Sequence, residues 1–340
     1  MSQDILSDVL RSVRLRGVLY FYVNGTRDWA AEAPSSREIA AAVIPGAEHV
    51  MEYHVVVSGS CWAAVTGEAP VRLETGDIVL FPHGDPHVVS SAAGMRAAPD
   101  PAGYFERQKQ DAPFVLHLGA REVPVSAAAD DPRSTTLVCG FLGCDLRPFN
   151  PLIASLPRLM HVRDDSRQDW AAQLMRQAAA ESKNRRPGGD AMLERLSEMT
   201  FIDAVRRYLG TLPEDSRGWL AGTRDRFVGR ALALMHEAPA DAWTVDELSR
   251  RVGLSRSALH ERFADMIGHG PMQYLANWRM QVGAALLRDT AATVASIAQE
   301  VGYQSEAAFT RAFKRQVGQT PSLWRRQSRP PAHPQLLRSR

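Results

Sequence analysis

Apolar residues recur at helical spacing in the last third of the chain, twice and in the same order. Leu248 and Val252 share one face at i, i+4, and Leu259 and Phe263 repeat that spacing after a glycine. The same order returns about 50 residues later, at Ile297, Val301, Phe309 and Phe313. Two short amphipathic helices joined at a glycine are typical of a helix-turn-helix, so the pattern predicts two such motifs in tandem.

Glycines and serines mark the ends of these predicted helices. Gly253 and Gly302 lie where the first helix of each copy must stop, a position that favours positive φ. Ser255 and Ser305 follow as expected N-caps of the second helices. The outer faces of these second helices are polar and suit base edges and phosphates in a major groove, although a solvated helix face has the same pattern. The candidate DNA-binding residues are Ser255, Arg256, Ser257, His260, Glu261 and Arg262 in the first copy, and Gln304, Ser305, Glu306, Thr310, Arg311 and Lys314 in the second.

The N-terminal part has a different pattern, with short apolar or alternating runs separated by turn signals. Turn pairs such as Asn24-Gly25 and Thr75-Gly76 punctuate the runs. Short strands at this spacing predict a β-sandwich or barrel. The predicted strands are residues 18–23, 51–57, 62–65, 71–73, 78–81, 87–90 and 114–118.

Helical spacing also appears between these two parts. Residues 152–160, 170–181 and 192–209 carry apolar side chains at helical intervals and predict a helical connector. The stripe on 192–209 is wide enough to pack on its own domain and on a second subunit, so we expect a homodimer, although core packing alone also explains the stripe. We therefore expect a sensor domain at 1–148, a connector and dimerisation region at 149–216, a DNA-binding domain at 217–327 and a disordered tail at 328–340.

Charge is divided unevenly between the two ends. The chain has 340 residues and a formal net charge of +2. After residue 216 there are 18 Arg plus Lys against 10 Asp plus Glu, a net of +8, whereas the rest of the chain carries −6. A basic C-terminal end on an acidic remainder is expected where only that end meets DNA phosphates.

The apolar runs and the cysteines of the sequence bear on where the protein is found and on whether its thiols are reduced. The sequence has neither an apolar run long enough to span a membrane nor a leader, so we expect a cytoplasmic protein without membrane contact. Three cysteines, Cys61, Cys139 and Cys144, cannot all pair and are expected to be reduced core thiols. A thiol-based redox sensor remains an alternative.

At its C-terminal repeat the chain resembles the AraC/XylS family of bacterial transcription factors. The resemblance lies in the tandem repeat, in residues 305–315 and in Gly318-Gln-Thr-Pro321. It implies two helix-turn-helix units joined by a long helix at about 271–287, with recognition helices in successive major grooves. It also implies a double-stranded DNA operator, a small-molecule effector, a homodimer, and RNA polymerase as a partner if binding activates transcription.

Residues 76–87 resemble the second motif of the cupin superfamily, G-x5-P-x-G-x2-H. A turn, a strand and a Pro-Gly turn would direct His87 into the mouth of a barrel. The first cupin motif is degraded, which leaves His49, His54 and His87 as candidate metal ligands, with Glu48 and Glu52 nearby. We favour a metal-free effector pocket, for which the candidates are Tyr53, His54, Trp62, Phe81 and His87.

These patterns together predict an α+β protein, with a cupin-like β-barrel (a double-stranded β-helix), a helical connector and an all-α domain of two helix-turn-helix motifs. The predicted function is that of a sequence-specific transcription factor controlled by a small effector, without enzymatic turnover or a cofactor. Two alternatives stay open. One is the thiol-based regulator, and the other is a metal-dependent cupin enzyme fused to a DNA-binding domain, which would need an intact metal ligand set.

Overall fold

The chain divides into two compact units whose segments alternate along the sequence. The computed structural model describes residues 4–107, 114–119, 134–164, 173 and 187–328. The helical unit comprises Met1–Val13, Leu146–Ser155 and Pro213–Arg340, and the β unit comprises Arg14–Asp145 and Leu156–Leu212. The expected domain limits at 148, 216 and 327 stay a prediction. Ser328, the first residue of the predicted tail, ends a helix, and the rest of the tail and most of the predicted connector helix at 170–181 lie outside the described residues.

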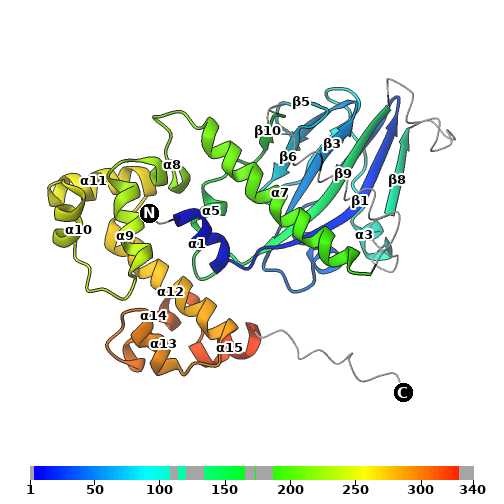
Figure 1. Ribbon diagram of the computed structural model, residues 1–340. Helices are drawn as coiled ribbons and strands as arrows, with labels where there is room; N and C mark the ends of the chain where they lie inside the picture. The colour runs from blue at the N-terminus through cyan, green and yellow to red at the C-terminus, as the bar shows by residue number, and fades with distance from the viewer. Residues whose placement is uncertain (1–3, 108–113, 120–133, 165–172, 174–186, 329–340) are drawn as a thin grey trace, which may run out of the picture. The chain divides into compact units, whose positions relative to one another are not determined.

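Two sheets form the β unit, and they are not closed into the single barrel that was expected. One has six strands in the order β10-β6-β3-β9-β1-β8 (Figure 1). The other has four strands in the order β2-β7-β4-β5. All seven predicted runs lie in strands, whereas β2, β9 and β10 lie outside them. The strands are β1 (Arg16–Thr26), β2 (Ala30–Ala33), β3 (His49–Ser58), β4 (Ser60–Val65), β5 (Val71–Glu74), β6 (Ile78–Phe81), β7 (His87–Ser90), β8 (Phe114–Gly119), β9 (Ser134–Cys144) and β10 (Met160–Val162).

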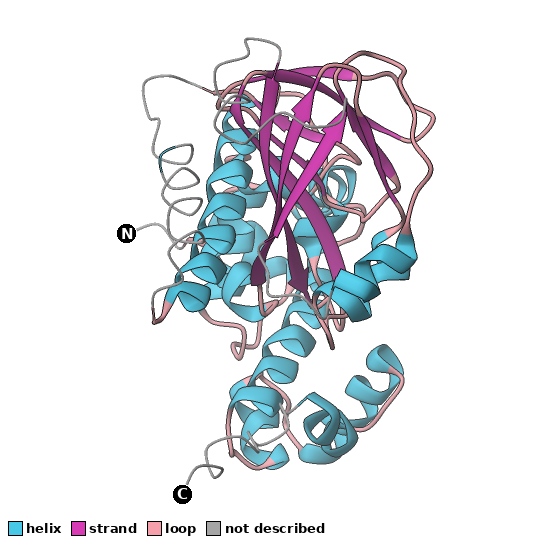
Figure 2. Ribbon diagram, turned by 90° about the vertical axis from the view of Figure 1, so that its right-hand side faces the viewer, coloured by secondary structure: helices cyan, strands magenta, loops and turns pink. Residues whose placement is uncertain are grey.

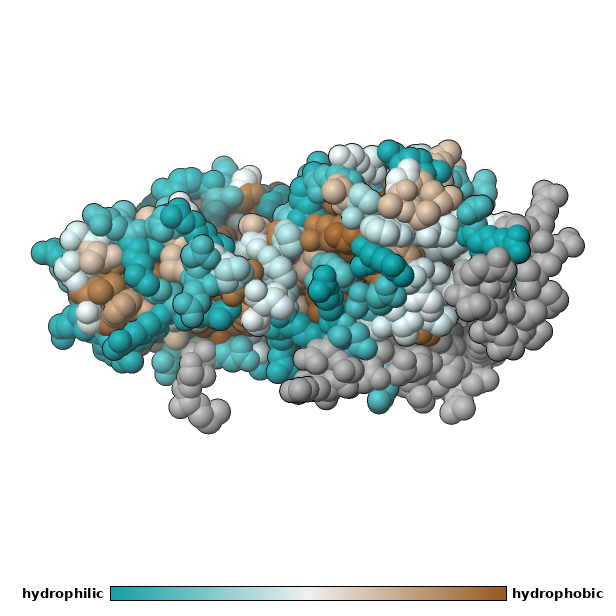
Figure 3. All heavy atoms as spheres, turned by 90° about the horizontal axis from the view of Figure 1, so that it is seen from above, coloured by the Kyte–Doolittle hydropathy of each residue, from teal (hydrophilic) through white to brown (hydrophobic). Residues whose placement is uncertain are grey.

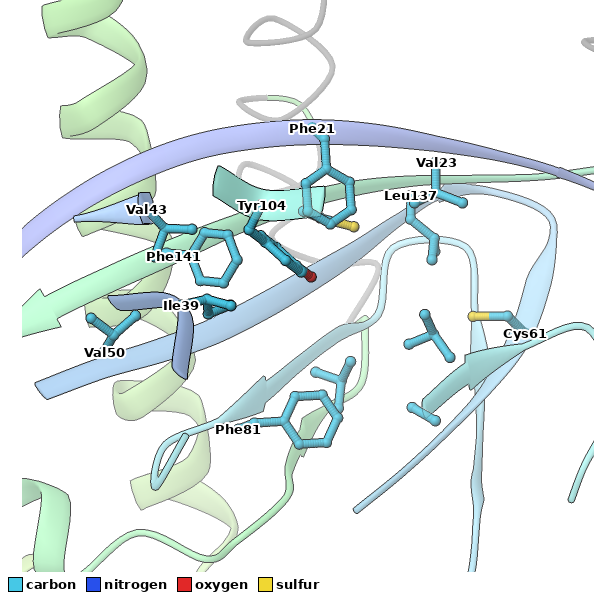
Figure 4. Packing of buried hydrophobic residues seen from close by; sticks show 14 of the residues in the cluster. Phe21, Val23, Ile39, Val43, Val50, Cys61, Phe81, Tyr104, Leu137 and Phe141 are labelled. Carbon is cyan, nitrogen blue, oxygen red and sulfur yellow. The ribbon is translucent and has the colours of Figure 1, made fainter. Parts of the chain in front are cut away.

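The core of the β unit combines side chains from both sheets with two short helices. Because side chains alternate along a strand, one face of each sheet contributes to this core. Helix α2 (Ser36–Val43) adds Ile39, and α3 (Pro101–Arg107) adds Tyr104. Figure 4 shows Phe21 and Tyr104 directed toward the same interior space.

A long helix, α7 (Gly189–Thr211), lies against strand β1 of the six-stranded sheet (Figure 1). The approach is close, because a Cβ added to Gly17 would lie 2.5 Å from the Cβ of Ser197. The helix confirms the predicted element at 192–209. The helix predicted at 152–160 was wrong: α5 (Pro151–Ala154) is short, and β10 begins at Met160. Pro157 lies between them and cannot donate the backbone hydrogen bond that a continuous helix needs.

From Pro213 to Ser328 the described chain contains helices and loops only (Figure 2). The first helix-turn-helix is α10 with α11, the second is α13 with α14, and the long helix α12 lies between them in sequence. The helices are α8 (Trp219–Arg224), α9 (Val228–Glu237), α10 (Val245–Val252), α11 (Arg256–Ile267), α12 (Pro271–Asp289), α13 (Val294–Glu300), α14 (Glu306–Val317) and α15 (Pro321–Ser328).

Both turns have the geometry that the sequence predicts. Gly253 and Gly302 have φ values of 83° and 82°, in the left-handed region that glycine tolerates. The hydroxyl oxygens of Ser255 and Ser305 accept hydrogen bonds of 3.2 Å from the N–H groups of Ala258 and Ala308. The four predicted core residues of the recognition helices, Leu259, Phe263, Phe309 and Phe313, are fully buried.

The first helix of the chain packs within the helical unit. In α1 (Ile5–Ser12), Val9 is fully buried, and the Gln281 side chain on α12 donates a 2.9 Å hydrogen bond to the Ser12 carbonyl. Within the described residues, no helix has both the length and the apolar character needed to cross a bilayer. On the face seen in Figure 3, hydrophilic residues predominate and apolar residues form small separate patches.

Candidate DNA-binding surface and candidate effector cavity

The two recognition helices, α11 and α14, present the predicted polar residues to solvent. Of the twelve candidate DNA-binding residues, only Thr310 is partly buried, and the others are exposed. Ser255 and Ser305 use their hydroxyl oxygens as N-caps, so these two residues set where each recognition helix begins. The structure thus brings the candidates of each copy onto one helix, as predicted.

On α11, the arginines are engaged by carboxylates of the same unit. Arg256 pairs with Asp246 at 2.7 Å. Arg262 pairs with Asp225 at 2.5 Å, and this carboxylate also accepts backbone N–H bonds from Phe227 and Val228 at the start of α9. Burial raises the pKa of Asp225, but the hydrogen bonds from Arg262 and the backbone outweigh it and hold the pKa below its usual value. Arg262 therefore ties α11 to the start of α9.

The cations of α14 are free of such partners. Arg311, Lys314 and Arg315 are exposed, and none makes an ion pair within the described part of the chain. An unpaired guanidinium or ammonium can contact a phosphate without first breaking an internal ion pair. The face of α14 is therefore the better prepared of the two recognition-helix faces to bind phosphates.

A cavity of about 200 Å³ opens between the two sheets of the β unit. Its walls are mainly apolar and come from both sheets and from α3. Figure 4 shows two of the wall residues, Phe21 of β1 and Tyr104 of α3. The polar residues at its wall include Glu52 and His54 on β3 and His87 on β7. A mainly apolar cavity with few polar groups is the usual form of a small-molecule site.

Strand alternation decides which predicted pocket residues reach this cavity. Glu52 and His54, two apart on β3, face it, whereas Tyr53 between them points to the opposite side and bonds Ser197 of α7 at 2.7 Å. The prediction that Tyr53 lines the pocket is thereby corrected. Trp62 borders a separate hollow of about 330 Å³ on the four-stranded sheet.

Two predicted residues form the polar cluster of the cavity, and Phe81 supports one of them. His54 and His87 bridge the two sheets through an Nε2 to Nε2 contact of 3.0 Å. The Phe81 ring stacks on His87 with centroids 3.6 Å apart but does not line the cavity. Glu52 was named only as a neighbour of the candidate ligands, although its i, i+2 spacing from His54 on a predicted strand was the available signal.

The hydrogen bonds of the two imidazoles form one directed chain. The His87 Nδ1 lies 3.0 Å from the Asp85 carbonyl, which can only accept, so this nitrogen carries the proton. In a neutral ring Nε2 of His87 then accepts, and His54 must donate from Nε2. His54 Nδ1 therefore accepts from the Cys139 thiol, 2.9 Å away on the paired strand β9.

Burial explains why these groups are uncharged. It lowers the pKa of His87 to about 4 and holds that of His54 well below its ordinary value. Burial also raises the pKa of Glu52 to about 8. Both carboxyl oxygens of Glu52 are buried without a hydrogen-bond partner, and they lie 3.8 and 3.7 Å from Nε2 of His54 and His87.

Two of the three predicted metal ligands, His54 and His87, come together, and the third does not. His49 lies elsewhere, with its Nε2 2.7 Å from the Pro82 carbonyl. Glu52, His54 and His87 have donor atoms within 4.8 Å of one another and are of the types that bind zinc. In the folded chain the two Nε2 atoms bond each other, so a metal ion at this cluster would have to replace that hydrogen bond, while each Nδ1 keeps its own partner.

Comparison with known families accounts for both units. The profile of the family described as Cupin matches residues 4–210, and that described as Helix-turn-helix domain matches residues 248–327. An AraC-like transcription regulator of Streptomyces antibioticus is 30% identical over 96% of this chain and 100% of its own length. The chain belongs to the AraC-like family of transcription regulators.

A second curated relative agrees with this assignment. The AraC-like chain is 28% identical to the HTH-type transcriptional regulator AlkR of Acinetobacter baylyi, over 96% of this chain and 100% of the relative. Among solved structures, the DNA-binding domain of AdpA in complex with a target DNA is 27% identical, covering 30% of this chain and 91% of that domain with a TM-score of 0.29.

The cysteines of this AraC-like regulator are poorly suited to redox chemistry. Cys61, Cys139 and Cys144 are buried, and none of them forms a disulfide within the described residues. Burial raises the pKa of Cys61 to about 12 and that of Cys139 well above its ordinary value. Reactive cysteines need a lowered pKa and access to solvent, so these features do not favour the thiol-based alternative.

Proposed function

We propose that this AraC-like regulator binds a specific operator through both recognition helices, and that a small molecule in the β-unit cavity controls that binding. The observation that carries the proposal is the duplicated helix-turn-helix, whose second recognition helix exposes unpaired cations. Electrostatic contacts with phosphates supply a large share of DNA affinity, and base edges in the major groove supply specificity.

The two helices contribute differently to this proposed contact. On α14, Arg311 and Lys314 are free to bind phosphates or a guanine edge, and Thr310, Gln304 and Glu306 complete the polar face. On α11 the proposed contacts are Arg256, Ser257, His260 and Glu261, with Arg256 leaving Asp246 when DNA binds. Arg262 is not among the proposed DNA contacts. Contact with DNA would separate it from the nearly buried Asp225 and break the link between α11 and α9.

The proposed role of the β unit is sensing without turnover. The cavity has a mainly apolar wall, and the imidazoles of His54 and His87 at that wall are hydrogen-bonded to each other. A ligand that prefers one state of the protein would shift DNA binding by no more than its difference in affinity for the two states. Because the curated relatives are transcription regulators, we place the protein with regulators and not with metal-dependent cupin enzymes.

We further propose that α7 supports a homodimer. Met192 and Met199 on this helix are 40% and 45% exposed, unusual values for large apolar side chains seven residues apart on one helix. Light scattering on the wild type and on Met199→Glu tests the idea. A dimer that becomes a monomer in the variant supports it, and an unchanged mass contradicts it.

Operator binding is tested with sequences selected from a random duplex library. Arg311→Ala should cost about 1–3 kcal/mol on the selected duplex but little on a scrambled one, if Arg311 contacts a base. Arg72→Ala, which removes the same charge from an exposed pair on β5, is the matched control and should change neither. Unchanged discrimination between the two duplexes in Arg311→Ala would contradict the assignment of α14.

A further inference from the structure

The cavity of the β unit contains one polar group whose bonding is incomplete. Glu52 is 1% exposed, lines the cavity, and has no hydrogen-bond partner for either carboxyl oxygen. Leaving a buried carboxyl group unpaired costs free energy that a bound donor can recover. Such a group, directed into a cavity, is a reason to look for the missing partner in a ligand.

The neighbouring imidazoles do not provide that partner. His87 donates from Nδ1 to the Asp85 carbonyl, and the His54 Nε2 proton is directed to His87. Cys139 completes the chain at His54 Nδ1. Because these bonds use every nitrogen of both rings, the rings lie 3.7–3.8 Å from Glu52 without a proton to give it.

The other carboxylates at the cavity wall already have cationic partners. Glu32 accepts a 2.8 Å hydrogen bond from Arg96, and Asp100 lies 3.7 Å from Arg107. Glu52 has no arginine or lysine beside it within the described residues. Glu52 is therefore the carboxyl group at the described cavity wall that has no cationic partner, and an ammonium ion bound beside it would stabilise its ionised form.

Shape and lining limit the rest of the ligand. A volume of about 200 Å³ is below the range of about 300–1,000 Å³ that holds drug-sized molecules, so the ligand is small. The remaining wall near Glu52 is formed by apolar side chains, among them Phe21, Val89 and Leu116. Aromatic rings such as those of Phe21 and Tyr104 also favour a cation over an anion in their neighbourhood.

We infer that the cavity binds a small primary amine, with its ammonium group on Glu52 and an apolar body against Phe21 and Tyr104. On binding, Glu52 would release its proton to solvent, and the ammonium would donate to both oxygens of the resulting carboxylate and leave the His54–His87 bond intact. This inference names the effector class for the sensing role proposed above and rests on that role.

Three probes of similar size and different charge test the inference directly. Calorimetry on the full chain would compare 2-phenylethylamine, the neutral 2-phenylethanol and the anion phenylacetate. We expect the amine to bind about tenfold more tightly than the alcohol, because hydrogen bonds to charged groups are stronger, and phenylacetate to bind least. Equal affinity for all three, or preference for the anion, would overturn the inference.

Variants at Glu52 separate a ligand contact from a structural effect. Glu52→Gln should weaken amine binding by at least about thirtyfold and leave the alcohol nearly unchanged. Glu74→Gln, an exposed carboxylate on β5 outside the cavity, is the matched control. Glu52→Met should raise the melting temperature of the free protein, since it removes a buried group without partners. Amine binding unchanged in both Glu52 variants would place the ligand elsewhere.

The same samples distinguish this inference from the proposed regulatory role. One Zn²⁺ bound per chain, lost in His87→Ala and competing with the amine, would identify a metal site in place of the amine site. If the amine binds through Glu52 but operator affinity does not change, the ligand class stands and the effector role fails. If no amine binds while operator binding still depends on Arg311, only the ligand class is wrong.

Discussion

Tyr53 and Ser197 form a buried hydrogen bond whose direction can be deduced, and the direction predicts unequal effects of removing its two ends. Both side chains are fully buried, and their hydroxyl oxygens are 2.7 Å apart. The Ser197 hydroxyl donates to the Leu193 carbonyl at 3.0 Å within α7. The Tyr53 hydroxyl must therefore be the donor to Ser197, since otherwise its own proton would have no acceptor.

The magnitudes follow from this direction. Tyr53→Phe removes one hydrogen bond but leaves Ser197 bonded to Leu193, so the free energy of unfolding should fall by about 1 kcal/mol. Ser197→Ala leaves a buried Tyr53 O–H without an acceptor, which costs about 1–3 kcal/mol, offset by at most about 0.7 kcal/mol from the better helix propensity of alanine. The double variant has no Tyr53 hydroxyl and therefore no buried donor without an acceptor, so it should be more stable than Ser197→Ala alone.

Urea unfolding of the full chain would be combined with hydrogen exchange of peptides from α7, because the two units can unfold in separate steps. Tyr208→Phe is the control, as the Tyr208 side chain on the same helix is partly exposed and makes no hydrogen bond within the described residues. Amine or alcohol binding to the cavity should not change in Tyr53→Phe. If the double variant were destabilised by the sum of the two single effects, the deduced direction would be wrong.

Three further outcomes are expected in the helical unit. Arg262→Ala should lower the stability of the helical unit by about 1 kcal/mol, because the ion pair with Asp225 is lost, and should leave discrimination between selected and scrambled duplexes unchanged. A loss of discrimination at unchanged stability would contradict this. Val9→Ala should cost about 2 kcal/mol and speed hydrogen exchange in α9 and α12, whereas unaltered exchange would show that α1 does not stabilise the unit. Burial lowers the pKa of His236, so below about pH 6.5 the unfolded chain binds more protons than the folded chain. The free energy of unfolding should therefore fall as the pH drops from about 6.5 toward the pKa of the folded state. His236→Gln should make this fall smaller.

The sequence determined those features that depend on neighbouring residues. Gly253 and Ser255, and their counterparts Gly302 and Ser305, specify turn and cap through contacts within three residues, so both helix-turn-helix motifs could be predicted from spacing alone. The strands of the β unit could be located in the same way, because alternation and turn residues are local. Apolar spacing at 152–160 predicted a helix, but the structure forms one only over Pro151–Ala154, before the break at Pro157, and Met160 begins a strand.

The tertiary structure decided which residues meet, because those contacts join positions far apart in the chain. Cys139 reaches His54 only through the register of β3 with β9, and His54 reaches His87 only because two sheets face each other. The same alternation that located β3 could not say which face turned inward, and that choice exchanged Tyr53 for Glu52 in the cavity. Burial against distant strands then removed the charge from these side chains, an effect of surroundings that no local pattern contains.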